Sequence, residues 1–151
     1  MKWLFSLILV FFLSQNIWAK EMKATYIVKA KGLNIGELIW KYNNFENFYE
    51  TNIILKNKGF LSGLYKFSGI YSSRGVVQNN VLISEEYNQQ WKTSKKDKNV
   101  KILFENKKIK EILIRPFEKE LIRVDIKELK NYSDPITSFI NIMFPSCTGW
   151  L

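Results

Sequence analysis

The sequence predicts a mainly β protein: an antiparallel curved sheet or a partly open β-barrel, with one short C-terminal helix. Three observations support this prediction. Apolar and polar residues alternate over most of the chain, which is typical of strands with one buried face. The alternating segments recur at a spacing of about 8–12 residues, with turn-forming residues between them. Aromatic residues make up 15% of the chain, and aromatic side chains favour strands.

The chain begins with an apolar leader. Lys2 precedes an apolar run of about ten residues, and a polar stretch at 14–16 separates this run from the small residue Ala19. The pattern predicts a secretory signal peptide over residues 1–19 and a single β-rich envelope domain over residues 20–151. The run is short for a bilayer-spanning helix, and an uncleaved membrane anchor is the alternative. We therefore expect an exported protein of the bacterial periplasm, with association with the outer membrane left open.

Residues 24–42 predict a β-hairpin directly behind the leader. The segment 32–36 contains glycine and asparagine, which accept positive φ, so the turn is expected there. A second turn is expected at Asn43-Asn44, followed by a strand over 49–56.

The middle of the chain continues the same pattern. Residues 58–64 are apolar but contain two glycines, and they predict a loop or a single helical turn. Turns are expected at Arg74-Gly75 and Asn106-Lys107, with a polar, lysine-rich tip over 92–99. Further strands are expected over 65–71, 81–91, 100–104, 109–115 and 121–126.

Only the C-terminal region has helical periodicity. Asp134 can cap a helix, and Pro135 suits the first helical position. Apolar residues then follow at the spacing of one helix face, and Pro145 ends the pattern. These apolar residues are Ile136, Phe139, Ile140 and Met143.

Composition excludes several kinds of chemistry. The chain has no histidine and one cysteine, Cys147, so no catalytic Ser-His-Asp triad, histidine-ligated metal or intrachain disulfide can form. Glu85 and Glu86 are adjacent, so on a strand they are expected to face opposite sides rather than act as a pair. We therefore expect no catalytic residue, no metal and no cofactor, and a hydrolase is the least favoured reading.

The formal net charge of +9 comes almost entirely from lysine. This excess has two explanations, an AT-rich coding genome or a selected basic surface. Arginine, which nucleic-acid-binding proteins favour for bidentate contacts, is scarce, and we expect no nucleic-acid partner. A basic tip could touch anionic lipid headgroups, or could simply be a solvated loop. Its residues are Lys92, Lys95, Lys96, Lys98 and Lys101.

Several short segments, taken in order, resemble a bacterial exported family called domain of unknown function 3108. They are the hairpin ATYIVKAKGLNIGEL, the segment KNKGFLSGLYKFSGIYSSRG, the strand containing Glu85-Glu86-Tyr87, and the late segment 134–139. Ile136 and Thr137 stand where the family usually has Leu and Ser. The resemblance implies a curved antiparallel sheet in the cell envelope and implies no activity. Family members usually continue for several strands, so we also expect this chain to be truncated or frameshifted at its C-terminus, where Cys147 lies.

An aromatic stripe is the candidate ligand site. Aromatic residues at strand spacing could line a cavity for an acyl chain or another apolar ligand, or could be simple core. They are Trp40, Tyr42, Tyr65, Phe67, Tyr71 and Tyr87. The leading hypothesis is a non-catalytic envelope protein that binds a hydrophobic or amphipathic ligand, in lipid or lipoprotein traffic. The alternative is a structural or assembly protein that recruits an envelope protein partner through a sheet edge or its basic surface.

Overall fold

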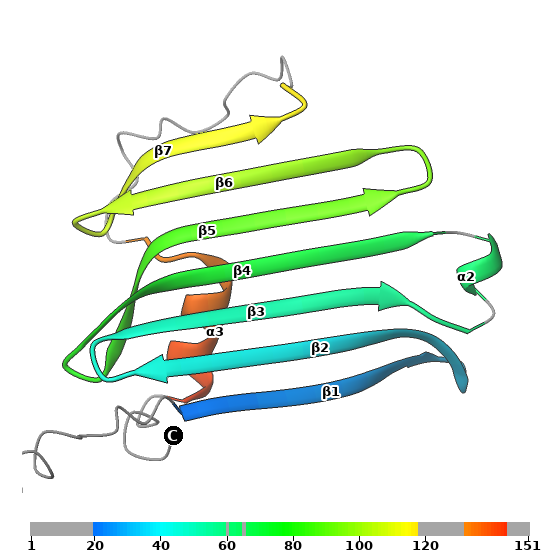
Figure 1. Ribbon diagram of the computed structural model, residues 1–151, viewed down its shortest axis with the longest axis horizontal. Helices are drawn as coiled ribbons and strands as arrows, with labels where there is room; N and C mark the ends of the chain where they lie inside the picture. Colours follow the sequence, from blue (N-terminus) through cyan, green and yellow to red (C-terminus); the bar gives the residue numbers. More distant parts are fainter. Residues whose placement is uncertain (1–19, 60, 65, 118–131, 145–151) are drawn as a thin grey trace, which may run out of the picture.

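The computed structural model describes residues 20–59, 61–64, 66–117 and 132–144. Seven strands form one antiparallel sheet in the order of the chain, so each strand pairs with its sequence neighbours (Figure 1). Because β1 and β7 are the two edges, this sheet is open rather than closed. The predicted fold class, a mainly β protein with an antiparallel sheet and one short C-terminal helix, is confirmed.

The elements follow one another closely along the chain. The strands are β1 (Lys20–Ala30), β2 (Leu33–Phe45), β3 (Phe48–Asn57), β4 (Phe67–Gln78), β5 (Val81–Thr93), β6 (Asp97–Glu105) and β7 (Lys108–Arg115). The helices are α2 (Leu61–Leu64), which is the expected single helical turn, and α3 (Pro135–Met143). The strand predicted over 121–126 lies outside the described residues, as do the predicted signal peptide and Cys147.

The predicted first hairpin is confirmed, but its turn is shorter than expected. Lys31 and Gly32 have φ of 49° and 80°, which suits the tight two-residue turn of a twisted hairpin. Gly36 lies inside β2, opposite Val28, where the register shifts by one residue.

Two other predicted turns are wrong, for different reasons. Asn43 and Asn44 lie inside β2, which continues to Phe45 and turns at residues 46–47. Arg74 and Gly75 lie inside β4, opposite a β-bulge of β5, and a Cβ on residue 75 would lie 1.9 Å from the backbone oxygen of Ile83. Glycine is needed at position 75 for close backbone approach rather than for reversal of the chain.

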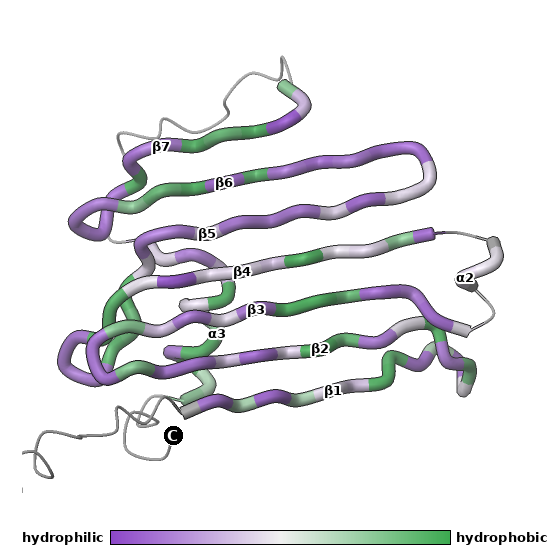
Figure 2. Tube along the Cα trace, viewed as in Figure 1, coloured by the Kyte–Doolittle hydropathy of each residue, from purple (hydrophilic) through white to green (hydrophobic). Residues whose placement is uncertain are grey.

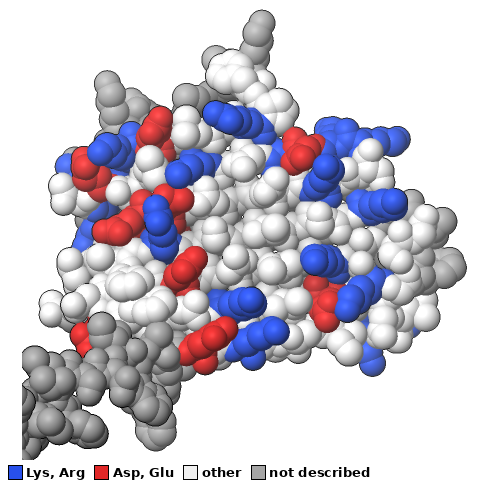
Figure 3. Space-filling model, viewed as in Figure 1, with Lys and Arg blue, Asp and Glu red and all other residues white. Residues whose placement is uncertain are grey.

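Hydrophobic and hydrophilic residues follow one another along the strands (Figure 2). Because successive side chains of a strand point to opposite faces, the two faces of the sheet differ. We call the side on which α3 packs the helix face and the opposite side the outer face. The register places Tyr42, Thr51, Ser73 and Tyr87 in one row across β2 to β5 on the helix face. The outer face, turned toward the viewer in Figure 3, has lysines and carboxylates spread between uncharged residues.

The core lies between the sheet and α3. Helix residues Ile136 and Ile140 are buried against the sheet, and α3 crosses the strands behind the sheet in the view of Figure 1. The buried sheet residues of this cluster are Tyr42, Tyr49, Leu82, Tyr87 and Phe104. The helix therefore covers one end of its face and leaves the other end uncovered by any described element.

Candidate functional site

The first turn of α3 is fixed by Asp134. Its Oδ1 atom accepts hydrogen bonds from the backbone N–H groups of Ile136 and Thr137 at 2.9 and 3.0 Å. These bonds satisfy two donors that the start of a helix leaves without partners. The predicted cap and the helix start at Pro135 are therefore confirmed.

The same carboxylate fastens α3 to the sheet. Asp134 Oδ2 accepts hydrogen bonds from Ser73 Oγ at 2.7 Å, Ser84 Oγ at 2.5 Å and Thr137 Oγ1 at 2.6 Å. Asp134 is 1% exposed, and its hydroxyl partners are buried as well. We call these four residues the Asp134 latch. No cation of the described residues pairs with this carboxylate, and it can be buried here because five donors surround it.

Tyr49 closes the latch from β3. Its hydroxyl lies 2.5 Å from Thr137 Oγ1 and 3.2 Å from Ser73 Oγ, and the residue is fully buried. Burial raises the pKa of Tyr49 most, the charge of Asp134 raises it further, and the hydrogen bonds from Ser73 and Thr137 lower it in part. These side chains are 0–4% exposed, and their hydrogen bonds join α3 to β3, β4 and β5. Sequence analysis identified only the cap, because Ser73 and Ser84 carry no local signal.

A second contact holds the helix further along. The side-chain amide of Asn141 donates to the backbone oxygen of Leu82 at 2.9 Å and accepts from its N–H at 3.0 Å. The ring centroid of Phe139, two residues earlier, lies 6.0 Å from that of Trp40 on β2. Helix α3 is thus attached to β5 near both ends, through Asp134 and Asn141, and Phe139 between them reaches β2.

The predicted aromatic stripe divides into two groups. Trp40, Tyr42, Phe67, Tyr71 and Tyr87 all lie on the helix face, and Tyr65 lies outside the described residues. Tyr42 and Tyr87 are only 4% and 6% exposed because α3 covers them. Trp40, Phe67 and Tyr71 lie on the part of the face that remains accessible, and each is half-buried.

The accessible half of the helix face is an apolar surface that we call the open track. Leu55, Gly69 and Trp91 stand in one row across β3, β4 and β5, next to a row with Ile53 and Tyr71. The ring of Tyr71 lies over Gly69, since a Cβ there would be 2.7 Å from Tyr71 Cε2. The track consists of Leu38, Trp40, Ile53, Leu55, Tyr71 and Trp91, all half-buried. Leu55 and Trp91 were missed as site residues, although the alternation of their strands places them there.

Trp40 marks the boundary between the covered core and the open track. Its indole Nε1 donates a hydrogen bond of 2.8 Å to Thr51 Oγ1, which in turn donates to the backbone oxygen of Lys41. These bonds fix the plane of the indole ring beside Phe139. The polar edge of the ring is satisfied within the sheet, so its apolar surface faces the track.

The predicted basic tip is the β5–β6 turn. Backbone N–H groups of Lys95 and Lys96 donate to Thr93 Oγ1, which holds the turn, and both side chains are exposed. Lys92, at the end of β5, has its ammonium 3.8 Å from Asp97. Lys98 is half-buried on β6.

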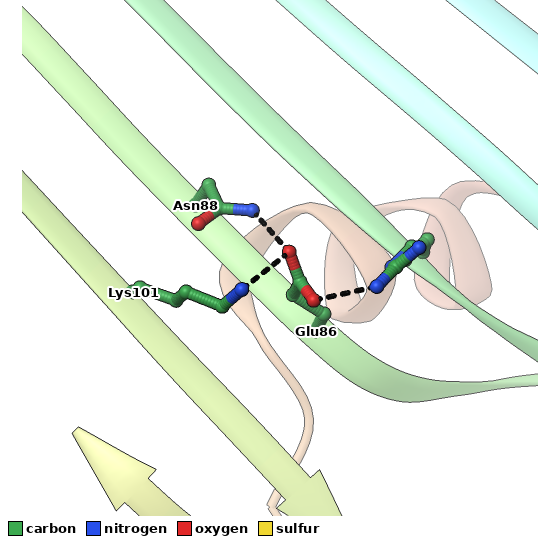
Figure 4. Close-up of polar contacts among 4 residues, drawn as sticks. Glu86, Asn88 and Lys101 are labelled. Atoms are coloured by element: carbon green, nitrogen blue, oxygen red, sulfur yellow. Dashed lines mark hydrogen bonds and ion pairs between the residues drawn. The ribbon is translucent and has the colours of Figure 1, made fainter. Parts of the chain in front are cut away.

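Lys101 does not belong to the tip, because it points to a cluster in the middle of the outer face (Figure 4). Glu86 accepts hydrogen bonds from Arg74 at 2.7 Å and Asn88 at 2.7 Å, and Lys101 Nζ lies 3.2 Å from the same carboxylate. Burial alone would raise the pKa of Glu86, but the hydrogen bonds from Asn88, Arg74 and Lys101 outweigh it and lower the pKa. Glu86 is therefore an ionised, ion-paired group at neutral pH and not a proton donor.

The β-bulge also changes the expected relation between Glu85 and Glu86. Arg74 pairs with Glu86 and Gly75 with Ser84, so Glu85 is the extra residue of β5. Both glutamates line one open cleft of about 420 Å³, together with Arg74 and Phe48. Strict alternation, which predicts opposite sides, does not hold at a bulge.

Within the described ranges, no group of three or more Cys, Asp or Glu residues is placed to hold a metal ion. No helix in this part of the chain is long and apolar enough to cross a bilayer. No protein-family model matches the chain, and neither do any of the curated proteins or solved structures. The resemblance to the exported family therefore stays a prediction.

Proposed function

We propose that this protein is a non-catalytic component of the bacterial cell envelope that binds a hydrophobic or amphipathic ligand along the open track. One observation carries the proposal: the apolar helix face extends well beyond the part that α3 covers. Leu55, Tyr71 and Trp91 stay half-buried where the covered residues Tyr42 and Tyr87 are almost fully buried.

Burial of this surface supplies the expected driving force. Each Å² of apolar surface removed from water contributes about 25 cal/mol. A ligand that completes the burial of two or three large side chains would therefore gain several kcal/mol before the costs of association, on the order of 4 kcal/mol or more, are subtracted. Contiguous apolar surface of this kind is uncommon on soluble proteins unless something binds there.

The side chains of the track also favour binding over catalysis. They are aliphatic or aromatic, and the nearest buried carboxylate, Asp134, is enclosed in the latch. Glu86, on the other face, is held by two cations. The predicted leader supports placement of this binding protein in the envelope.

Native mass spectrometry of the chain purified from a bacterial periplasm without detergent tests the proposal. We expect a discrete added mass that organic extraction removes. Leu55→Asn should reduce the fraction of the protein that carries this added mass. Ile54→Asn, at the adjacent position on the outer face, should leave that fraction unchanged. A chain that carries no added mass, and takes up none from added lipid, would contradict the proposal.

A second function, assembly through the sheet edge, is favoured by one observation. No described strand pairs with the outer side of β1 or of β7, and β1 is 11 residues long. Such an edge can accept a strand from a partner protein. Photo-crosslinkers placed at Thr25 and at Leu113 would capture a discrete envelope partner if this function holds, and capture of none would count against it.

A further inference from the structure

The connections between strands form two sets at opposite ends of the sheet. The β1–β2, β3–β4 and β5–β6 connections lie at the end away from α3, on the right in Figure 1, and the other three lie at the opposite end. With two flanking residues on each side, the first set covers 29–34, 56–68 and 92–98. The second set covers 44–49, 77–82 and 104–109. We call the first set the basic end.

Charge is distributed unequally between these two sets. The basic end has nine lysines and one acidic residue, Asp97, whereas the opposite set has two lysines and two glutamates. On the outer face in Figure 3, lysines gather toward the right with few carboxylates among them, and both signs are mixed toward the left. An AT-rich coding genome would enrich both ends in lysine alike. The asymmetry therefore favours a selected basic surface.

Most of the positive charge of the basic end is exposed and without a counter-charge. Eight of its nine lysines are exposed, and Lys98 is half-buried. Lys58 pairs with Glu37 at 2.5 Å, and Lys92 lies 3.8 Å from Asp97. Six others make no ion pair with a described residue. They are Lys29, Lys31, Lys56, Lys66, Lys95 and Lys96.

The charge belongs to the end of the sheet rather than to one of its faces. Lys56 and Lys92 lie on the outer face, in one row with a serine between them, and the register places Lys98 on the helix face. Lys31 and Lys95 lie in the turns beyond the strand ends. Four spacings between strands separate the β1–β2 turn from the β5–β6 turn, or roughly 19 Å. A partner that meets all three connections must therefore approach end-on and be extended.

We propose that the basic end docks the protein onto a membrane surface that contains anionic phospholipids. Lysine ammonium groups donate hydrogen bonds, and phosphate oxygens are acceptors that form strong bonds with them. A cleft of about 480 Å³ at this end is lined by Lys56, Lys66 and Lys92, and it accommodates a headgroup phosphate. The other lysines contact the surrounding headgroups.

Two observations favour a lipid surface over a nucleic acid. The basic end contains no arginine, the residue that nucleic-acid recognition uses for bidentate contacts. Leu33, which follows the β1–β2 turn, is 61% exposed at the same end. An apolar side chain among lysines can enter the interface of a bilayer, whereas a nucleic-acid backbone offers it nothing. The docking needs no ligand on the open track, so it can be tested separately from the proposed function.

Flotation of the protein with two kinds of lipid vesicle tests the inference. One kind is phosphatidylcholine alone, and the other contains about 30% phosphatidylglycerol, which supplies negative charge. The test variant takes one exposed lysine from each connection: Lys31→Gln/Lys66→Gln/Lys95→Gln. The control removes the same charge from exposed positions toward the other end: Lys23→Gln/Lys107→Gln/Lys108→Gln. Each variant alters one turn residue with positive φ, Lys31 or Lys107, so backbone effects are matched.

We expect the unaltered protein to float with the anionic vesicles and not with the neutral ones, and a higher salt concentration to release it. Each lysine near an anionic surface contributes about fivefold to binding. The test variant should therefore bind at least roughly tenfold more weakly, and the control should stay within about threefold of the unaltered protein.

Equal losses in the two variants would overturn the inference, because net charge alone would then explain the binding. Equal binding to anionic and neutral vesicles, or binding to neither, would overturn it too. So would tighter binding of a DNA duplex than of anionic vesicles, since the partner would then be a nucleic acid. Each of these failures leaves the proposed function intact, because no lysine of the basic end belongs to the open track.

Discussion

Ser84 Oγ on β5 lies 2.5 Å from Oδ2 of Asp134, fifty positions later in the chain. The same hydroxyl accepts the backbone N–H of Asp134 at 3.1 Å, so the two residues are joined twice. This pairing explains why a nine-residue helix, too short to be stable alone, has a fixed place on the sheet.

Replacing Asp134 with alanine should destabilise the protein by about 3 kcal/mol, since it removes a helix cap and leaves the latch hydroxyls buried without their acceptor. Urea denaturation followed by circular dichroism measures the change. Asp97→Ala, at a half-exposed carboxylate on β6, is the control and should cost less than about 0.5 kcal/mol. A loss below about 1 kcal/mol for Asp134→Ala would mean that the latch contributes little.

Stability should fall when the pH rises above ~10, the ordinary pKa of tyrosine. Burial raises the pKa of Tyr87 to about 12, and the pKa of Tyr49 is raised as well. The folded state therefore keeps protons that the unfolded state loses, so this stability is fully present below pH ~10 and is lost as the pH rises toward 12. Urea midpoints at about pH 9 and about pH 11 measure the effect. Tyr87→Phe should reduce the difference between the urea midpoints at the two pH values, whereas Tyr26→Phe, at an exposed position, should leave it unchanged. The same difference in both variants would refute the assignment of this pH dependence to Tyr87.

The Glu86 cluster should have the opposite pH dependence. Because the pKa of Glu86 is lowered from its ordinary value of 4.5, its contribution is present above that pH and is lost as the pH falls through the folded-state pKa. Glu86→Gln should cost about 0.5–1 kcal/mol at neutral pH, the range of partly exposed ion pairs, and close to nothing at about pH 3. Chemical denaturation at both pH values measures this. Glu85→Gln, the exposed neighbour, is the control; a Glu86→Gln cost that persists at about pH 3 would point to packing instead.

Much of the sheet could be predicted because each strand has one buried and one polar face. The errors fell where two turn signals competed. Arg74-Gly75 looks like a turn in isolation, but Asn79 and Asn80, with φ of 49° and 64°, reverse the chain five residues later. The glycine instead serves a bulge, and a bulge depends on the partner strand, which the local sequence does not specify.

The candidate site could be predicted less well than the fold. Alternation identifies Tyr42, Tyr71 and Tyr87 as one face, but it does not show which of them α3 covers. That depends on Asp134 meeting Ser73 and Ser84, contacts between residues at least fifty positions apart. The row of Lys56, Ser68 and Lys92 on the outer face was missed for the same reason, because these residues meet only through strand pairing.

Two glycines of β4 should respond differently to alanine, and the comparison tests the open track. At Gly75 the added Cβ would lie 1.9 Å from the backbone oxygen of Ile83, which cannot move without breaking the bulge. At Gly69 it would meet the ring of Tyr71, the end of a side chain that can turn away. We expect Gly75→Ala to cost more than about 2 kcal/mol and Gly69→Ala less than about 1 kcal/mol in thermal unfolding.

Gly69→Ala should nevertheless weaken ligand binding, because Tyr71 is displaced into the space that an apolar chain would occupy. Calorimetry with dodecyl maltoside measures this, and we expect roughly a tenfold loss of affinity at nearly full stability. Ser72→Ala, on the outer face of the same strand, is the control and should leave the affinity unchanged. If Gly69→Ala binds the detergent as tightly as Ser72→Ala, the ligand does not lie along Tyr71. The track would then have to be placed elsewhere on the sheet.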